Sequence, residues 1–135
     1  MDVLSPAAKE RALLEDFLLL PDPQERLALI VEACAGLGIP PGERREEDVV
    51  AGCVSRVWVR GGMEGGRLRL EWEAESPLVR GLAGLLCRVS AGAGEVQGYR
   101  SGILRALGLD RQLSPTRWRG LEAVEARIGE LAGRL

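Results

Sequence analysis

Three cysteines, Cys34, Cys53 and Cys87, carry the side chains of this sequence that are best suited to nucleophilic chemistry. None belongs to a CxxC pair, and their odd number argues against a framework of disulfides. The chain has no histidine, and its single lysine, Lys9, lies close to its start. Cysteine–histidine and serine–histidine catalysis therefore lack their base, a zinc site lacks ligands, and Lys9 is poorly placed to hold pyridoxal phosphate. Chemistry must depend on thiol, carboxylate or guanidinium groups, and the sequence predicts no metal and no cofactor.

The three cysteines differ in their sequence surroundings. Cys34 and Cys87 fall among apolar residues that recur at helical spacing, so both are predicted to be buried structural thiols. Cys53 follows Gly52 in a short connection where neither a helical nor a strand pattern requires an apolar side chain. It is the candidate reactive thiol, and the nearby Arg56 could stabilise its thiolate. From spacing alone, a structural role for Cys53 stays equally open.

Helical patterns cover most of the chain. Proline ends the first of them, and the dipeptides Ser76-Pro77 and Ser114-Pro115 read as helix starts, with a serine cap before a proline at the first helical position. We expect a helix over residues 7–19 and a second one that follows the prolines of residues 21–23 at once and stops near Gly36 and Gly38. Further helices are expected over residues 76–90, 95–107 and 114–135.

Two segments alternate between apolar and polar residues, as half-buried strands do. They cover residues 54–60 and 67–73, and the glycine-rich stretch 61–66 is expected to close a hairpin between them. Pairing Arg60 with Arg67 would place Val59 opposite Leu68, Val57 opposite Leu70 and Arg56 opposite Glu71. Arg56, Trp58 and Arg60 would then lie on an open, wet face. With Val49-Val50 as a short edge strand, the fold class is α+β: an antiparallel sheet of about three strands with helices on one face.

Length and charge limit the function further. A chain of 135 residues fits one domain spanning 1–135, and we find no internal repeat or linker. The formal net charge is -2, which provides no basic field for nucleic acid or for an anionic membrane. No secretory signal or bilayer-spanning run is evident, so we expect a cytoplasmic protein with free thiols.

The run around Cys53 has a more specific pattern. Residues 50–58 read Val-Ala-Gly-Cys-Val-Ser-Arg-Val-Trp. This run closely resembles the Gly-Cys-x-Ser-x-Val-Trp signature of the SufE family, whose members accept sulfur and stimulate cysteine desulfurases. Segments similar to other family motifs follow in order along the chain, at residues 16–27, 78–82, 113–117 and 120–123. The chain departs from the family pattern at Val54 and Arg56, where glutamine is frequent, at Gln112 in place of histidine, and at Glu75 in place of aspartate. These changes bear on partner choice more than on the nucleophile.

The resemblance implies a fold of the SufE type and a role in sulfur relay. A SufS-like cysteine desulfurase would carry sulfur as a persulfide, Cys53 would accept it, and an iron–sulfur scaffold or a tRNA-thiolation branch would receive it. The chain would be an accessory protein and activator rather than a stand-alone enzyme. Arg56 and Arg117 are candidates to stabilise the thiolate, Arg117 is expected to pair with Glu75 or Glu122, and Val50 or Val54 to cover the resting thiol.

Two other functions remain open at this point. A thiol peroxidase or redox sensor would also use a lone thiolate such as that of Cys53, although Ser55 is the only hydroxyl directly beside it. An adaptor would bind a desulfurase without carrying sulfur. Arg56, Trp58 and Arg60, with the charged stretch 43–48, are the candidate docking surface for the desulfurase.

Overall fold

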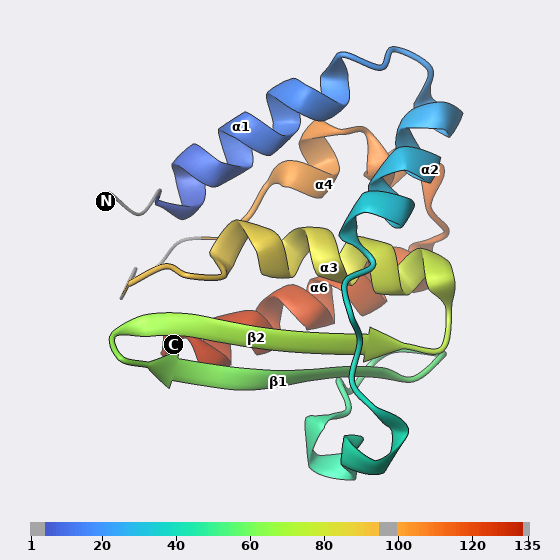
Figure 1. The fold of residues 1–135 in the computed structure, drawn as a ribbon. Helices are drawn as coiled ribbons and strands as arrows, with labels where there is room; N and C mark the ends of the chain where they lie inside the picture. The colour runs from blue at the N-terminus through green and yellow to red at the C-terminus, as the bar shows by residue number, and fades with distance from the viewer. Residues whose placement is uncertain (1–4, 95–99, 134–135) are drawn as a thin grey trace.

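The computed structural model describes residues 5–94 and 100–133 and shows an α+β fold with one antiparallel hairpin. Figure 1 shows α3 and α6 packed against one side of the hairpin, with α1, α2 and α4 on the far side of α3. The elements in chain order are α1 (Pro6–Leu18), α2 (Pro23–Cys34), the short 3-10 helices η1 (Pro41–Glu43) and η2 (Glu46–Asp48), β1 (Val57–Glu64), β2 (Arg67–Ala74), α3 (Pro77–Ser90), α4 (Ile103–Ala106), α5 (Leu109–Gln112) and α6 (Pro115–Leu131).

The helix starts follow the capping residues that the sequence indicated. The hydroxyl of Ser76 accepts a hydrogen bond from the amide of Val79, and that of Ser114 accepts one from the amide of Arg117. In both cases a proline follows the cap. Proline lacks an amide hydrogen, but the amide at the first helical position has no partner within the helix, so no hydrogen bond is lost. The predicted boundaries of α3 and the predicted start of α6 are confirmed, as are the boundaries of α1 and α2 to within a few residues. The predicted end of α6 at 135 is not confirmed: the helix ends at Leu131, and residues 134–135 lie outside the described residues.

The predicted hairpin register is wrong by four residues. Arg60 lies opposite Glu71 rather than Arg67, and Val59 lies opposite Trp72 rather than Leu68. The reason is the turn: Gly65 and Gly66 have φ of 58° and 78°, which a two-residue type I′ turn requires, so both strands run up to it. A six-residue loop was expected there instead. Because four is an even number, the face assigned to each strand residue is unchanged.

The outer face of the hairpin is covered at Trp58, which corrects the predicted exposure of this residue. This side chain is 6% exposed, and the Arg44 guanidinium lies over its ring, 5.4 Å from the centroid. The segment between α2 and β1 crosses this face, and Val49 forms an isolated bridge with Trp58 in place of a third strand. The surface proposed around Arg56 and Arg60 therefore lacks an exposed aromatic residue.

A buried carboxylate fastens the crossing segment to the sheet and to α3. Glu73 is 6% exposed, and its carboxylate lies 3.1 Å from Arg44 Nη2 and 3.4 Å from Arg80 Nε. It also accepts hydrogen bonds from the amides of Ile39 and Ala74. Two arginines and two amides satisfy this buried charge, so Glu73 holds together three parts of the chain.

The predicted helix over 95–107 is only partly found. Residues 95–99 lie outside the described residues, and residues 100–107 contain one four-residue helix, α4. A second four-residue helix, α5, lies beyond the predicted range. Gly108, with φ of 78°, separates them, because this left-handed conformation ends the first helix and begins the second.

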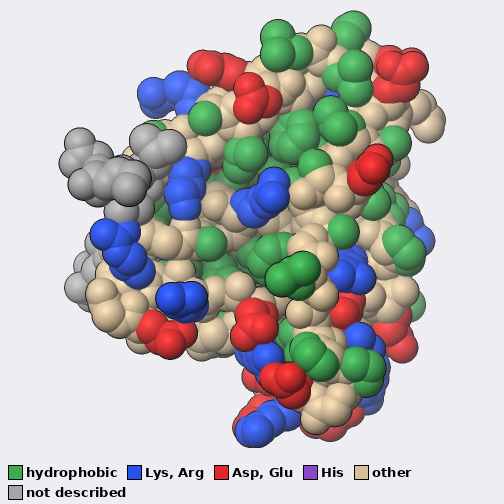
Figure 2. Space-filling model, in the orientation of Figure 1, with side chains coloured by type: hydrophobic (Ala, Val, Ile, Leu, Met, Phe, Trp, Pro, Cys, Tyr) green, Lys and Arg blue, Asp and Glu red, His purple; other side chains and the backbone are tan. Residues whose placement is uncertain are grey.

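The hydrophobic core lies between the hairpin and the helices, and it contains two of the three cysteines. Cys34 and Cys87 are both 0% exposed, which confirms their prediction as buried thiols. Figure 2 shows that basic, acidic and hydrophobic side chains are interspersed on the face of the molecule seen there. Among the described residues, no helix is long and apolar enough to cross a membrane.

Candidate functional site around Cys53

Cys53 lies in a loop of five residues, Ala51–Ser55, that we call the Cys53 loop. It connects the bridge residue Val49 to β1, and Gly52 within it has φ of 96°, a conformation that favours glycine. Ala51, Gly52 and Val54 are exposed, whereas Cys53 and Ser55 are partly buried. The thiol therefore points inward from an otherwise exposed bend.

The Cys53 thiol rests against the N-terminal half of α6. Its Sγ lies 3.5 Å from the main-chain oxygen of Gly120, to which the thiol donates a hydrogen bond. This is the one hydrogen bond shown between the Cys53 loop and the rest of the described residues. The loop itself is thus held weakly, and the thiol is its main point of attachment.

Both ends of the Cys53 loop are held firmly. On the side before the loop, the amide of Val50 donates to the oxygen of Val57 at 2.8 Å, and Arg127 donates to the main-chain oxygens of Asp48 and Val49 at 3.4 and 3.1 Å. On the side after it, the amide of Arg56 donates to Glu75 Oε1 at 2.7 Å. A weakly held loop between two fixed ends can change position without disturbing the fold.

A cavity of about 220 Å³ opens beside the thiol. It lies where the beginnings of α3 and α6 approach the Cys53 loop, because the two capping serines are among its lining residues. The wall is made of small, hydroxyl-bearing and apolar side chains together with one guanidinium: Cys53, Val54, Ser55, Ser76, Val79, Ser114, Thr116, Arg117 and Gly120. The cavity offers space next to the sulfur and hydrogen-bond donors around that space.

Burial raises the pKa of the Cys53 thiol above its ordinary value of 9.0. Taking a thiol out of water disfavours its charged form, and the main-chain oxygen of Gly120 accepts a hydrogen bond that only the protonated thiol can donate. The resting side chain is therefore a thiol rather than a thiolate. Burial raises the pKa of Cys34 and Cys87 as well.

The predicted supporting residues occupy two different places. The Arg56 guanidinium forms an ion pair with Glu46 at 2.6 Å, and Glu75 binds the Arg56 amide, so these two residues hold the end of the loop. Arg117 lines the cavity. The expected ion pair of Arg117 with Glu75 or Glu122 is not found among the ion pairs of the described residues, and this leaves its charge available to the cavity.

The two valines predicted to cover the thiol lie in different surroundings, and Val54 does not cover it. Val50 is buried, at 4% exposed, and belongs to the core. Val54 is 85% exposed, so it lines the mouth of the cavity without closing it. Val54 therefore presents an apolar side chain to solvent directly beside the thiol.

Sequence reasoning missed Arg127 and the role of Gly120. Arg127 donates hydrogen bonds to three main-chain oxygens, those of Asp48, Val49 and Val59, from one point on α6. The available signal was spacing: Thr116, Gly120 and Arg127 stand at i, i+4 and i+11, which places them on one helical face.

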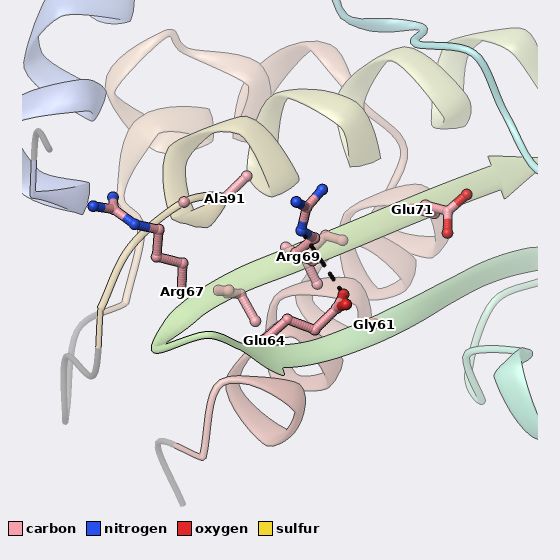
Figure 3. Close-up of a pocket in the computed structure, with 9 residues that line it drawn as sticks. Gly61, Glu64, Arg67, Arg69, Glu71 and Ala91 are labelled. Carbon is pink, nitrogen blue, oxygen red and sulfur yellow. Dashed lines mark ion pairs between the residues drawn. The ribbon is translucent and has the colours of Figure 1, made fainter.

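A larger cavity lies elsewhere. It has a volume of about 490 Å³ and lies between β2 and the end of α3, where Figure 3 shows Arg67 and Arg69 projecting from β2. Glu64 and Arg69 face one another across the hairpin at 3.9 Å. No cysteine lines this cavity. Within residues 5–94 and 100–133 there is also no group of three or more metal-ligating side chains.

Comparisons with known proteins give consistent results. Residues 11–132 match the family model "SufE: Fe-S metabolism associated domain". An uncharacterized SufE-like protein of Rhizobium meliloti is 31% identical over 132 residues, covering 91% of this chain and 94% of that protein. One of Rhizobium etli is 30% identical over 128 residues, covering 89% and 86%. The solution structure of a hypothetical protein from Thermus thermophilus aligns with a TM-score of 0.75 and 31% identity, covering 98% of this chain and 97% of that one.

Proposed function

The chain belongs to the SufE family, whose domain is associated with iron–sulfur metabolism, and we propose that it serves this metabolism by accepting sulfur on Cys53 from a cysteine desulfurase. The observation that carries the proposal is the arrangement of this one thiol. Cys53 is partly buried on a loop with fixed ends and borders a cavity, whereas Cys34 and Cys87 are enclosed in the core.

The transfer itself is a thiol–disulfide type of exchange. The Cys53 thiolate attacks the terminal sulfur of a persulfide on the desulfurase, and a bond forms between Cys53 Sγ and that sulfur as the sulfur–sulfur bond of the donor breaks. The donor cysteine leaves as a thiolate, and Cys53 holds the persulfide. No outside oxidant or reductant is needed, because one persulfide replaces another.

The attack requires a movement of the Cys53 loop. In its resting position the sulfur faces Gly120 and remains protonated, so it is poorly placed to reach a cysteine on another protein. Docking of the desulfurase draws the loop outward, while Arg127 and Glu75 keep its two ends in place. The exposed Val54 offers the partner an apolar contact next to the nucleophile.

The cavity beside Cys53 suits the loaded state. A persulfide is open to attack by oxidants and by other thiols, so it must be sheltered between donor and acceptor. A space of about 220 Å³ is ample for one added sulfur atom. The guanidinium of Arg117 and the hydroxyls of Ser114 and Thr116 can donate to a persulfide anion that turns into it.

The place of the protein in the cell follows from this role. We propose a cytoplasmic accessory protein, with a SufS-like desulfurase as donor and an iron–sulfur scaffold as acceptor. As a single sulfur-acceptor domain it stimulates the desulfurase by removing sulfur from it, rather than catalysing a reaction alone. A tRNA-thiolation branch is the alternative destination for the sulfur.

One experiment separates the carrier from a peroxidase and from an adaptor. The wild-type protein and Cys53→Ser are each incubated with a cysteine desulfurase and cysteine, and sulfide release and intact mass are measured, with Cys34→Ala as the control. We expect wild type and Cys34→Ala to gain sulfur and stimulate the desulfurase, and Cys53→Ser to do neither. Full stimulation by Cys53→Ser would indicate an adaptor. If the wild-type protein gained no sulfur but consumed added peroxide in the absence of a desulfurase, it would be a peroxidase.

A further inference from the structure

The Cys53 loop is the tip of a short hairpin, residues 49–58, that we call the Cys53 hairpin. The amide of Val50 donates to the main-chain oxygen of Val57 at 2.8 Å, and Val49 forms an antiparallel bridge with Trp58. Each arm of this hairpin therefore has two paired residues, whereas β1 and β2 have eight residues each. A hairpin with such short arms needs support from outside to stay closed.

Arg127 of α6 takes the place of the next pair in this hairpin. Hydrogen-bonded and non-bonded pairs alternate in an antiparallel ladder, so Asp48 and Val59 would form the next bonded pair. The amide of Asp48 cannot serve it, because this amide donates to the oxygen of Arg45 at 3.0 Å. Instead, Arg127 Nη1 donates to the main-chain oxygens of Asp48 and Val59 at 3.4 and 3.2 Å. Arg127 Nη2 donates to the oxygen of Val49 at 3.1 Å. One guanidinium thus joins the two arms at the open end of the hairpin, and we call these three bonds the Arg127 clamp.

The chemistry of arginine suits this position. Val59 is 0% exposed, so its main-chain oxygen is closed off from water and needs a donor from the protein. A guanidinium is planar, stays charged and carries five N–H donors in a fixed fork, so one side chain can bond several oxygens at once. The carboxylate of Glu130, 3.7 Å from Arg127 Nε, is largely exposed and contributes less.

Helix α6 therefore holds the Cys53 hairpin at two points. At the open end Arg127 donates three hydrogen bonds, and at the tip the main-chain oxygen of Gly120 accepts one from the Cys53 thiol at 3.5 Å. Arg127 comes seven residues after Gly120, about two helical turns or about 10 Å along α6. The bond at the tip must break when the thiol turns toward a partner, whereas the bonds at the open end can stay in place.

We propose that Arg127 is a positioning residue for sulfur acceptance, because it fixes the open end of the Cys53 hairpin while the tip moves. This inference rests on the proposed function. The Arg127 clamp limits how often the tip leaves its resting place, and it limits the directions in which the tip can move. The sulfur of Cys53 then reaches the donor persulfide in line for attack. Loss of the clamp makes the thiol more accessible to small molecules but slower to accept sulfur from a protein.

The test measures both rates in wild type, in Arg127→Met and in the control Glu130→Gln. Methionine keeps an unbranched apolar stem and removes the three hydrogen bonds, whereas Glu130→Gln removes only the ion pair of Arg127. Iodoacetamide should alkylate Cys53 about tenfold faster in Arg127→Met than in wild type. A saturating cysteine desulfurase with cysteine should load sulfur onto Cys53 about tenfold more slowly. Glu130→Gln should keep both wild-type rates.

The opposite direction of the two changes is a readout that a merely structural role would not give. Both rates are expressed per folded molecule, with the folded fraction taken from circular dichroism. A general loss of stability lowers that fraction but leaves the loading rate of the folded molecules unchanged. A wild-type value for either rate in folded Arg127→Met would overturn the inference.

A second variant covers the case in which Arg127→Met does not fold. Arg127→Lys keeps the positive charge, but a compact ammonium lacks the fork that bonds three oxygens at once. The same opposite changes, each about threefold, support the Arg127 clamp, and wild-type values in both measurements overturn it. Failure of the proposed function is distinct: Cys53 would still be alkylated faster in Arg127→Met, but the wild-type protein itself would gain no sulfur.

Discussion

Cys53 and Cys87 place the same side chain in opposite surroundings. Cys87 lies within α3 at 0% exposure, with the hydrogen bonds of the helix fixing its backbone. Cys53 lies on a loop that makes a single hydrogen bond to the rest of the described residues, through the thiol itself. Burial raises the pKa of both thiols. The two cysteines differ in the size of the structural change that would expose the sulfur. Exposing Cys53 requires a few loop residues to move, whereas exposing Cys87 requires the core to open.

The largest expected effect is in alkylation by a small reagent. Exposing Cys87 requires opening of the core, whereas exposing Cys53 requires only the loop to move, so native Cys53 should react about a thousandfold faster or more. Peptide mapping after a timed reaction with iodoacetamide measures both rates in one sample. In denaturant the two rates should become similar. Comparable native rates would remove the distinction between the two regions.

The variant Glu73→Gln tests whether the stability of the fold and the exposure of the Cys53 thiol are independent of each other. Glu73→Gln leaves Arg44 and Arg80 facing a buried neutral group, and it should lower the free energy of unfolding by about 3 kcal/mol. Urea unfolding followed by circular dichroism measures this change. The rate of Cys53 alkylation under native conditions should stay near that of wild type. A large rise in that rate would mean that the Cys53 loop depends on the network around Glu73.

The buried thiols should make stability depend on alkaline pH. The folded protein holds Cys87 with a pKa raised by burial, whereas in the unfolded chain this thiol ionises near its ordinary value of 9.0. A raised folded pKa gives stability that is present below the unfolded pKa and is lost as pH rises above it. Between about pH 8 and about pH 10, the free energy of unfolding should fall by about 1 kcal/mol on account of Cys87.

Cys87→Ala provides the control for this pH dependence. The variant should be less stable at neutral pH, because it loses buried volume, but its stability should fall less between the two pH values. Urea unfolding at both pH values measures the difference. An equal fall in wild type and Cys87→Ala would show that Cys87 ionises alike in the folded and unfolded states, and would contradict its raised pKa in the folded protein.

The smallest effect is expected at the end of the Cys53 loop. Glu75→Ala removes the carboxylate that accepts the Arg56 amide at 2.7 Å, so the loop should leave its resting position more often. Because one exposed hydrogen bond contributes little, Cys53 alkylation should rise about fivefold or less. Glu122→Ala, which removes an exposed carboxylate of α6, is the control and should keep the wild-type rate. A slower rate in Glu75→Ala would contradict the view that Glu75 restrains the loop.

Local signals predicted much of the fold. The Ser-Pro starts at Ser76 and Ser114 and the apolar stripe of α3 are properties of a few neighbouring residues, and the structure agrees with them. The hairpin register was missed because it depends on the turn at Gly65 and Gly66, and a stretch with two pairs of glycines leaves the position of a turn open. The position of Cys53 outside helix and strand could likewise be predicted from pattern alone.

The remaining features depend on contacts between distant parts of the chain. Trp58 looked exposed by alternation, but it is buried because Arg44 crosses over it. Gly120 contacts the Cys53 loop, and Arg127 contacts the segment just before it, from a helix that is distant from both in sequence. No local pattern contains such contacts, although the one-sided spacing of the α6 residues gave a partial sign of them.

The most direct test of the central claim is to map sulfur onto the three cysteines. The protein is incubated with a cysteine desulfurase and cysteine, persulfides are trapped with an alkylating reagent, and the peptides that contain Cys34, Cys53 and Cys87 are weighed by mass spectrometry. The account predicts one added sulfur atom on the Cys53 peptide and none on the other two. Sulfur on Cys34 or Cys87, or on no peptide, would contradict it.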